Sequence, residues 1–470
     1  MSGVTTHCVH LFWTSVLAAD MEPGIVGGNA LCARFSTVSG GGGVLAALFA
    51  FVLLAAPSLA LSGVVWPQQA ELQASDGAQY DNFGFSVGVS GDLAVVGSPY
   101  DDNVGGTDAG SVYVYLRDPV LGTWTLDAKL VASDGAAFDD FGYSVAISGN
   151  TILVGAPFDD NAGGANAGSA YVFIKNPVTG IWTLTTKLLA SDGASSDEFG
   201  TSVAIDGDNA VIGAPLHSKD PLLANVEGAA YVFVRDPPTE SWSQQAELFA
   251  SDGGVEDAFG TSVAISGGTV VVGAPFNDRT FFFDVGAAYV FVWCPETGTW
   301  EQQTKLSASD GAEFDDFGTS VGISGDTAIV GAPFHSKDPL LQNSEGAAYV
   351  FVRDVWLGVW TEQAKLTASD AAPVAYFGTS VAISCDTVVV GARGDGIYAG
   401  SAYVFVRDTS TGTWPEQAKL DASDRAVYDQ FGTSVSIDYD TALVGAPYHD
   451  KDVLTSNSGS AYVFVRVSCC

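Results

Sequence analysis

The chain has 470 residues, of which 47% are hydrophobic and 15% are charged, so it is long enough and apolar enough to bury a large core. Its 18 basic and 54 acidic residues give a formal net charge of −36, which repels nucleic-acid phosphates and anionic membranes. The 55 glycines favour tight turns and disfavour a helical protein. Nucleic acid is therefore not expected as a partner, whereas cations and basic partners suit this surface.

Residues 1–63 differ from the rest of the chain and are interpreted as a leader. An apolar run that ends in small residues spans positions 44–60, with Ser58 and Ala60 at the −3 and −1 positions of a signal cleavage site. A retained membrane anchor is the alternative, because about 17 apolar residues come close to the minimum for a spanning helix. We expect a secreted or cell-surface protein that contacts the membrane only through this segment if it is not cleaved.

A sequence unit repeats seven times in the domain expected at residues 64–467, which a tail at 468–470 follows. Its clearest marker is a tryptophan at intervals of 54 to 60 residues: Trp66, Trp124, Trp182, Trp242, Trp300, Trp360 and Trp414. Each unit holds three runs rich in β-branched and aromatic residues and a fourth in which polar and apolar residues alternate. This pattern predicts an all-β fold, a seven-bladed β-propeller of four-stranded antiparallel blades.

The two ends of the repeat array predict a closed ring. The array begins with an unaccompanied fourth strand at Trp66–Leu72 and stops after a third strand at Tyr462–Val465. The N-terminal strand can therefore complete the last blade, a complementarity that an open solenoid does not need. We expect one closed propeller and a monomer.

Each unit also carries Phe-Gly at its first strand and Gly-Ala-Pro, or a close variant, at its second. Phe317-Gly318 with Gly331-Ala332-Pro333 is one instance, and Phe141-Gly142 with Gly155-Ala156-Pro157 is another. The chain thus resembles the FG-GAP repeat family, the repeat of the integrin α-subunit propeller. Integrin-type blades often carry an Asp-x-Asp-x-Asp-Gly calcium loop between the first two strands. Here that connection is close to Ser-Gly-Asp-Thr, too short to surround calcium, so the family's metal residues do not carry over.

Carboxylates gather on the loops that we expect at one face of the ring. Aspartates in the loop before the first strand of each blade are expected mainly to cap turns through backbone amides. The Asp-Asp-Asn-x-Gly-Gly loops of the first two blades are the better candidates for calcium, because they offer several oxygen ligands. The candidate calcium ligands are Asp101, Asp102, Asp108, Asp159 and Asp160.

Loops that break the symmetry of the repeat are the candidate partner-binding sites. The fourth blade inserts three phenylalanines, the third and fifth share His-Ser-Lys-Asp-Pro, and the sixth holds Arg-Gly-Asp, the tripeptide of animal adhesion ligands. The alternatives are that the aromatic residues fold back onto the blade and that the tripeptide arises by chance. The candidate residues are Phe281, Phe282, Phe283, His217, Lys219, His335, Lys337, Arg393 and Asp395.

We find no nucleophile elbow, no His-Glu-x-x-His, no phosphate-binding loop and no Cys-x-x-Cys, so no catalytic residue is assigned. We therefore expect a non-catalytic, secreted or cell-surface propeller that binds a protein or a glycan through its loops, with calcium as the candidate cofactor. One alternative is an extracellular hydrolase that uses carboxylates of the loop face. The other is a structural matrix or cell-wall protein whose acidic face collects cations.

Overall fold

The structure is a computed structural model that describes residues 64–219, 225–278, 283–338, 342–450 and 456–468. The predicted leader, with its signal or anchor segment at 44–60, and most of the predicted tail lie outside the described residues. The blades form one compact unit, Val65–Val467. No helix in the described part of the chain is long and apolar enough to cross a membrane.

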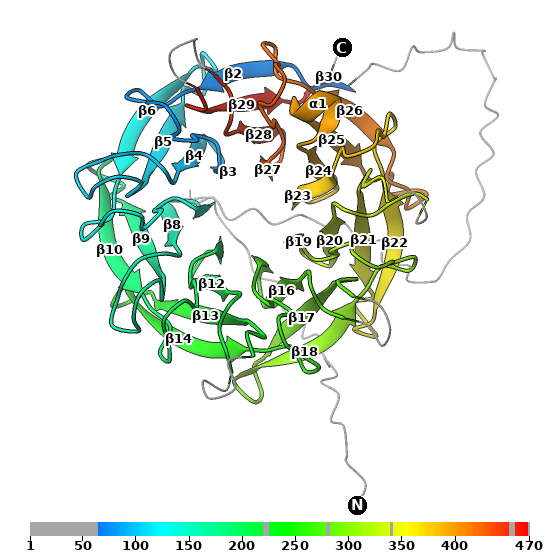
Figure 1. Ribbon diagram of the computed structural model, residues 1–470, viewed down its shortest axis with the longest axis horizontal. Coiled ribbons are helices and arrows are strands. Elements are labelled where there is room, and N and C mark those ends of the chain that lie inside the picture. Colours follow the sequence, from blue (N-terminus) through cyan, green and yellow to red (C-terminus); the bar gives the residue numbers. More distant parts are fainter. Residues whose placement is uncertain (1–63, 220–224, 279–282, 339–341, 451–455, 469–470) are drawn as a thin grey trace, which may run out of the picture. The chain divides into compact units, whose positions relative to one another are not determined.

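Seven four-stranded antiparallel sheets are arranged in a ring, which confirms the predicted propeller (Figure 1). The innermost strands are β3 (Ser86–Ser90), β7 (Ser144–Ser148), β11 (Ser202–Asp206), β15 (Ser262–Ser266), β19 (Ser320–Ser324), β23 (Phe377–Ser384) and β27 (Ser434–Asp438). The second strands are β4 (Leu93–Ser98), β8 (Thr151–Ala156), β12 (Asn209–Ala214), β16 (Thr269–Ala274), β20 (Thr327–Ala332), β24 (Thr387–Ala392) and β28 (Thr441–Ala446).

The remaining strands build the outer half of the ring. Blades are numbered in chain order, and blade one begins with β3. The third strands are β5 (Ser111–Arg117), β9 (Ser169–Lys175), β13 (Ala229–Asp236), β17 (Ala287–Cys294), β21 (Ala347–Arg353), β25 (Ser401–Val406) and β29 (Ser460–Val465). The outermost strands are β6 (Trp124–Leu130), β10 (Trp182–Leu188), β14 (Ser241–Leu248), β18 (Thr299–Leu306), β22 (Trp360–Leu366), β26 (Glu416–Leu420) and, for blade seven, β2 (Gln68–Leu72).

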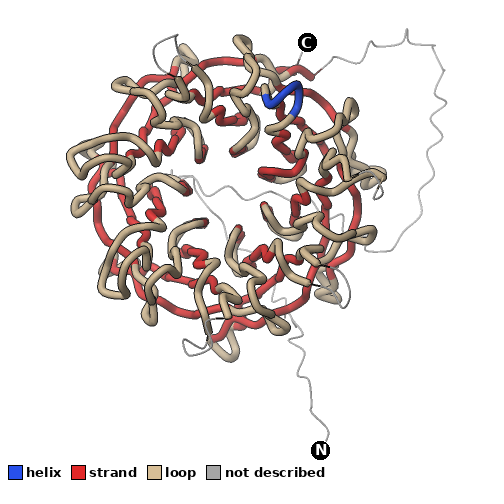
Figure 2. Tube along the Cα trace, in the orientation of Figure 1, coloured by secondary structure: helices blue, strands red, loops and turns tan. Residues whose placement is uncertain are grey.

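Two further strands and one helical turn lie outside the blade pattern. Strands β1 (Val64–Val65) and β30 (Val467–Ser468) pair with each other. The turn α1 (Asp395–Tyr398) follows the second strand of blade six and is drawn in blue in Figure 2. Strands and loops therefore make up nearly all of the described chain.

The N-terminal strand completes the last blade, as predicted. Strand β2 pairs antiparallel with β29, with Glu71 opposite Tyr462 and Leu72 opposite Ala461. Residues about 390 positions apart in the chain thus share one sheet, and the ring is closed by β2.

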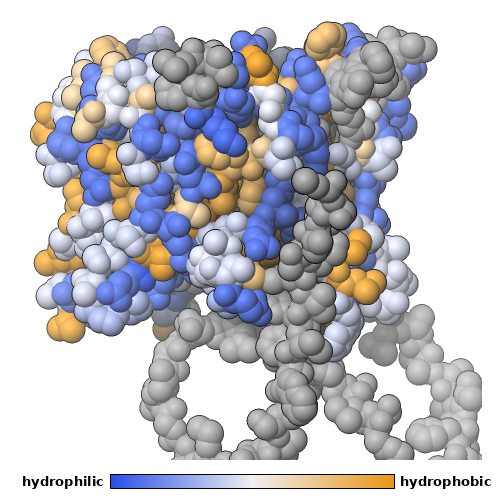
Figure 3. Space-filling model, turned by 90° about the horizontal axis from the view of Figure 1, so that it is seen from below, coloured by the Kyte–Doolittle hydropathy of each residue, from blue (hydrophilic) through white to orange (hydrophobic). Residues whose placement is uncertain are grey.

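Burial follows the radial position of each strand. All six residues of β20 are buried, whereas exposed and half-buried residues alternate along much of β22. Within blade five, Phe317 packs edge-on against Tyr349 and Phe351, with ring centres 5.5 and 6.0 Å apart. The innermost strands line an axial channel of about 250 Å³ with mainly valine, alanine and isoleucine side chains. The outer side drawn in Figure 3 is mostly hydrophilic, with apolar residues exposed between the polar ones.

The glycines of the two repeat motifs are required by the contact between blades. A Cβ on Gly331, in the Gly-Ala-Pro of blade five, would lie 2.1 Å from the carbonyl oxygen of Gly378, in the Phe-Gly of blade six. Gly378 itself has a φ of +95°, a conformation that residues with a Cβ rarely adopt. Ser320 Oγ donates to the same Gly378 carbonyl at 2.8 Å. The motif therefore allows two backbones to meet where side chains would hold them apart.

Candidate functional site

The loops at one end of the blades form a single surface, which we call the loop face. It is built from the blade-linking loops, which join an outermost strand to the next innermost strand, and the mid-blade loops, which join second and third strands. The two kinds of loop touch across blade boundaries, since the Phe314 N–H donates to the Phe283 carbonyl at 3.1 Å and the Asp316 N–H donates to the Asp284 carbonyl at 3.1 Å. Chemistry on this face can therefore involve two adjacent blades.

One aspartate in each of six blade-linking loops caps its own turn, which confirms the capping prediction for this aspartate. Its carboxylate accepts the backbone N–H of the residue three positions earlier at 2.6–2.8 Å. The residues are Asp81, Asp139, Asp197, Asp257, Asp315 and Asp429. These carboxylates are buried and serve the fold first.

A second aspartate of the blade-linking loop belongs to a four-residue group that recurs in every blade, here called the blade cluster. Its other members are the tyrosine of the third strand, the residue before the last leucine of the outermost strand, and the second residue after Gly-Ala-Pro or its variant. In blade five, Lys365 Nζ lies 2.6 Å from Asp310 Oδ2 and 2.7 Å from His335 Nε2. Tyr349 donates its hydroxyl to Asp310 at 2.8 Å.

Lysine closes the blade cluster in five blades, through Lys129, Lys187, Lys305, Lys365 and Lys419. The lysine sets the protonation state of its partner. Burial acts to raise the pKa of Asp310, but hydrogen bonds from Lys365 and Tyr349 outweigh burial and lower that pKa below its usual value. These clusters are therefore closed ion pairs at neutral pH.

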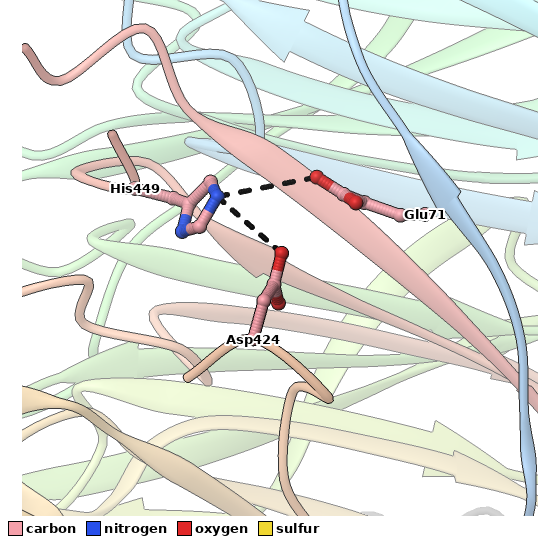
Figure 4. A group of neighbouring side chains, drawn as sticks. All are labelled: Glu71, Asp424 and His449. Atoms are coloured by element: carbon pink, nitrogen blue, oxygen red, sulfur yellow. Dashed lines mark ion pairs between the residues drawn. The ribbon is translucent and has the colours of Figure 1, made fainter. Parts of the chain in front are cut away.

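Blades three and seven have glutamate in place of the lysine. In blade three, His217 Nε2 lies 3.8 Å from Asp192 Oδ2 and 3.5 Å from Glu247 Oε1. In blade seven, His449 Nε2 lies 3.6 Å from Asp424 Oδ2 and 4.0 Å from Glu71 Oε1, and all three side chains point toward one another (Figure 4).

The glutamates change the electrostatics of these two clusters. Burial raises the pKa of Glu247 to about 7, and the neighbouring Asp192 carboxylate adds to the increase. Burial acts to lower the pKa of His217, but the hydrogen bond to Asp197 and the surrounding carboxylates outweigh it and raise that pKa. Each cluster thus concentrates negative charge around one imidazole nitrogen.

A cleft of about 690 Å³ opens on the loop face at the junction of blades four and five. Its lining includes Phe276, Phe314, Phe334, Asp284 and Asp316. The first two phenylalanines are 45% and 47% exposed, so their rings are available to a ligand. Burial raises the pKa of Asp316 to about 7, and the nearby Asp284 carboxylate adds to the increase.

The repeat itself identifies the family. A family model described as FG-GAP repeat matches residues 66–115, 124–173, 182–233, 242–291, 300–351, 360–405 and 414–464. The chain belongs to the FG-GAP repeat family. It matches no curated protein. Among solved structures, the crystal structure of the Saccharomyces cerevisiae Sqt1 is similar, with a TM-score of 0.43 and 10% identity over 84% of this chain and 97% of that chain.

The candidate calcium ligands of this FG-GAP propeller lie in two equivalent mid-blade loops. Asp101 and Asp159 are buried members of the blade clusters of blades one and two, where each carboxylate lies 2.9 Å from the lysine ammonium. Asp102 accepts the backbone N–H of Asp108 at 3.0 Å, and Asp160 caps its own loop in the same way. The carboxylates of Asp101 and Asp159 thus pair with lysine, whereas those of Asp102 and Asp160 accept backbone N–H groups. Calcium binding by these loops stays a prediction.

Histidine and phenylalanine candidates for partner binding lie in different environments. His217 and His335 are 4% and 5% exposed and belong to blade clusters. Phe283 is 63% exposed beside the cleft, whereas Phe281 and Phe282 lie outside the described residues.

Three of the four charged candidates for partner binding contact neighbouring side chains. The Lys219 ammonium lies 4.7 Å from the ring centre of Phe249, and Lys337 is exposed. In the Arg-Gly-Asp tripeptide, Arg393 stacks over Tyr376, and the buried Asp395 carboxylate pairs with lysine and arginine side chains at 2.9 Å. A role of these residues in partner binding stays a prediction.

Reasoning from the sequence missed the cleft and the two lysine-free clusters. The signal for the clusters was present, because the pair Lys-Leu that ends the other outermost strands is Glu71-Leu72 and Glu247-Leu248 in these blades. Each glutamate accompanies a histidine two residues after Gly-Ala-Pro, in His449 and His217. The cleft left no such signal, because Phe276, Phe314 and Phe334 come from three separate loops.

Proposed function

We propose that this FG-GAP propeller is a non-catalytic, secreted or cell-surface module that binds a protein or a glycan on its loop face. The observation that carries the proposal is the cleft between blades four and five, where exposed phenylalanine rings stand beside carboxylates. Ligand sites are typically concave, mainly apolar and supplied with a few polar groups that fix orientation. Aromatic rings can stack on sugar rings or on apolar side chains, and carboxylates accept hydrogen bonds from hydroxyl or amine groups.

An extracellular hydrolase is the second candidate, since a buried carboxyl with a raised pKa can act as a general acid. Asp316 beside Asp284 meets that description in the cleft. However, the same arrangement occurs in blade two, where burial and the Asp108 carboxylate raise the pKa of Asp140 to about 7. A feature that recurs with the repeat supports a structural origin, so binding without catalysis remains the leading proposal.

The test is a binding screen of the full chain on a glycan array and on a panel of purified extracellular protein domains, with and without calcium. For any ligand found, Phe314→Ala should weaken affinity about tenfold or more, as loss of a central aromatic contact does. Phe138→Ala is the matched control, because Phe138 holds the equivalent position in blade two and is 61% exposed. Equal affinities for both variants and the unaltered chain would place the site elsewhere. Hydrolysis of a bound glycan that Asp316→Asn abolishes would favour the hydrolase.

A further inference from the structure

The loop face holds a cation in a fixed position in five of its blades. The lysine ammonium lies 2.6–2.7 Å from the aspartate of the blade-linking loop and 2.7–2.9 Å from the second residue after Gly-Ala-Pro or its variant. It also lies 5.0–5.6 Å from the ring centre of the third-strand tyrosine. The blade cluster is thus a site built around positive charge.

In blade five, a histidine of the blade cluster contacts the lysine ammonium. An ammonium group can only donate hydrogen bonds, so His335 Nε2 must accept from Lys365 with its lone pair. The proton of the neutral ring therefore sits on Nδ1, which lies 2.8 Å from Asp315 Oδ2. The carboxylate behind the ring fixes the tautomer and points the Nε2 lone pair at the cation.

Blades three and seven keep this histidine arrangement and lose the lysine. His217 Nδ1 lies 2.8 Å from Asp197, and His449 Nδ1 lies 3.2 Å from Asp429, so each Nε2 again faces the cluster. His217 is 4% exposed, and its Nε2 meets the carboxylates of Asp192 and Glu247. In each of these two blades, one nitrogen and two carboxylate oxygens lie within 4.8 Å of one another.

We propose that blades three and seven each bind a divalent transition-metal ion of the zinc type, in the position that lysine fills elsewhere. The ligands are His217, Asp192 and Glu247 in blade three, and His449, Asp424 and Glu71 in blade seven. One imidazole with two carboxylates suits zinc, whereas calcium and magnesium prefer oxygen ligands alone. Three protein ligands leave a coordination position open to water or to a ligand.

The surroundings of the two sites fit a metal ion from solution. The carboxylates are partly exposed, with side-chain exposures of 46% for Asp192 and 41% for Asp424, so an ion can enter from the loop face. With a neutral imidazole, two ionised ligand carboxylates and the carboxylate behind the ring leave negative charge that a divalent cation offsets.

The test is isothermal titration of the chelator-treated full chain with zinc chloride at pH 7.5. Glu71→Lys and Glu247→Lys should each remove one zinc ion, and the double variant should lose both. Each variant recreates the histidine–lysine pair of blade five, so it should fold, as circular dichroism can check. The double variant keeps every cysteine and every histidine of the chain. Any zinc that it still binds therefore measures binding outside the two proposed sites.

A variant designed to gain a zinc site provides an independent test of the proposal. Lys365→Glu gives blade five a histidine and two carboxylates with the same layout, through His335 and Asp310. This variant should bind one more zinc ion than the unaltered chain. Zinc binding that is absent from the unaltered chain, or that persists unchanged in the double variant, would overturn the proposal.

Discussion

Asp140 in blade two is a buried carboxylate without the lysine contact that characterises the blade clusters. It is 6% exposed and has a φ of +55°, a conformation that asparagine and aspartate tolerate better than most residues. Burial and the nearby Asp108 raise its pKa to about 7. Blade one has Asn82 at the equivalent position, so the fold accepts an amide there. Charge at Asp140 therefore opposes folding once the group ionises.

We predict that Asp140→Asn stabilises the protein at pH 8 by about 1–2 kcal/mol and much less at pH 5. The carboxyl has a raised folded-state pKa, so the folded protein binds the proton more tightly than the unfolded chain, whose aspartate pKa is about 3.9. The contribution of the Asp140 carboxyl to stability is therefore fully present below about pH 4 and is lost as pH rises through about 7. Urea unfolding at the two pH values measures the difference. Parallel pH profiles for the variant and the unaltered chain would contradict the prediction, and Asp316→Asn offers an independent repeat.

At the level of elements, the outermost strands are tied to one another around the ring by tryptophan. In six blades the indole Nε1 donates to a glutamine or aspartate on the outermost strand of the preceding blade at 2.7–2.9 Å. The acceptors are Gln417, Gln69, Asp127, Gln245, Gln303 and Gln363. In blade three, Trp242 Nε1 is buried and finds no acceptor among the described residues. The residue at the acceptor position is Thr185, on β10.

We predict that Thr185→Gln stabilises the protein by about 1 kcal/mol, because it supplies the missing acceptor for a buried donor. Thr185 is exposed, so the longer side chain has room. Thermal and urea unfolding measure the gain. The matched background is Trp242→Phe, which removes the donor, and there Thr185→Gln should bring no gain. A gain of equal size in both backgrounds would mean that strand propensity, and not the hydrogen bond, is responsible.

The strands could be predicted from the sequence because each copy repeats the same local pattern. The apolar run of β20 and the alternation along β22 each match a radial position in the blade. The function of the tryptophans and of the Lys-Leu pairs could not be predicted, because both act between segments about 30 to 60 residues apart, such as Trp124 with Gln69. Local patterns specify strands, whereas the sites depend on which loops the ring brings together.

At the scale of the whole molecule, the ring depends on one short strand. Strand β2 supplies Leu72, which is 3% exposed, to the core of blade seven, and covers the free edge of β29. It also supplies Glu71, one of the three proposed metal ligands of that blade. Metal bound there would join the first strand of the ring to the last blade, which the metal in blade three cannot do.

We predict that a chain beginning at residue 74, compared with one beginning at residue 64, unfolds at a lower temperature and self-associates. Removal of β2 leaves the backbone groups of β29 unpaired, and an exposed strand edge is a template for pairing with a second chain. Differential scanning calorimetry and light scattering measure the two effects. A synthetic peptide of residues 64–73 should restore both properties, whereas the same peptide with Leu72→Asp should not, because it would place a charge in the apolar core. A truncated chain that stays monomeric and melts at the original temperature would show that six complete blades, with three strands of the seventh, hold the ring without its closing strand.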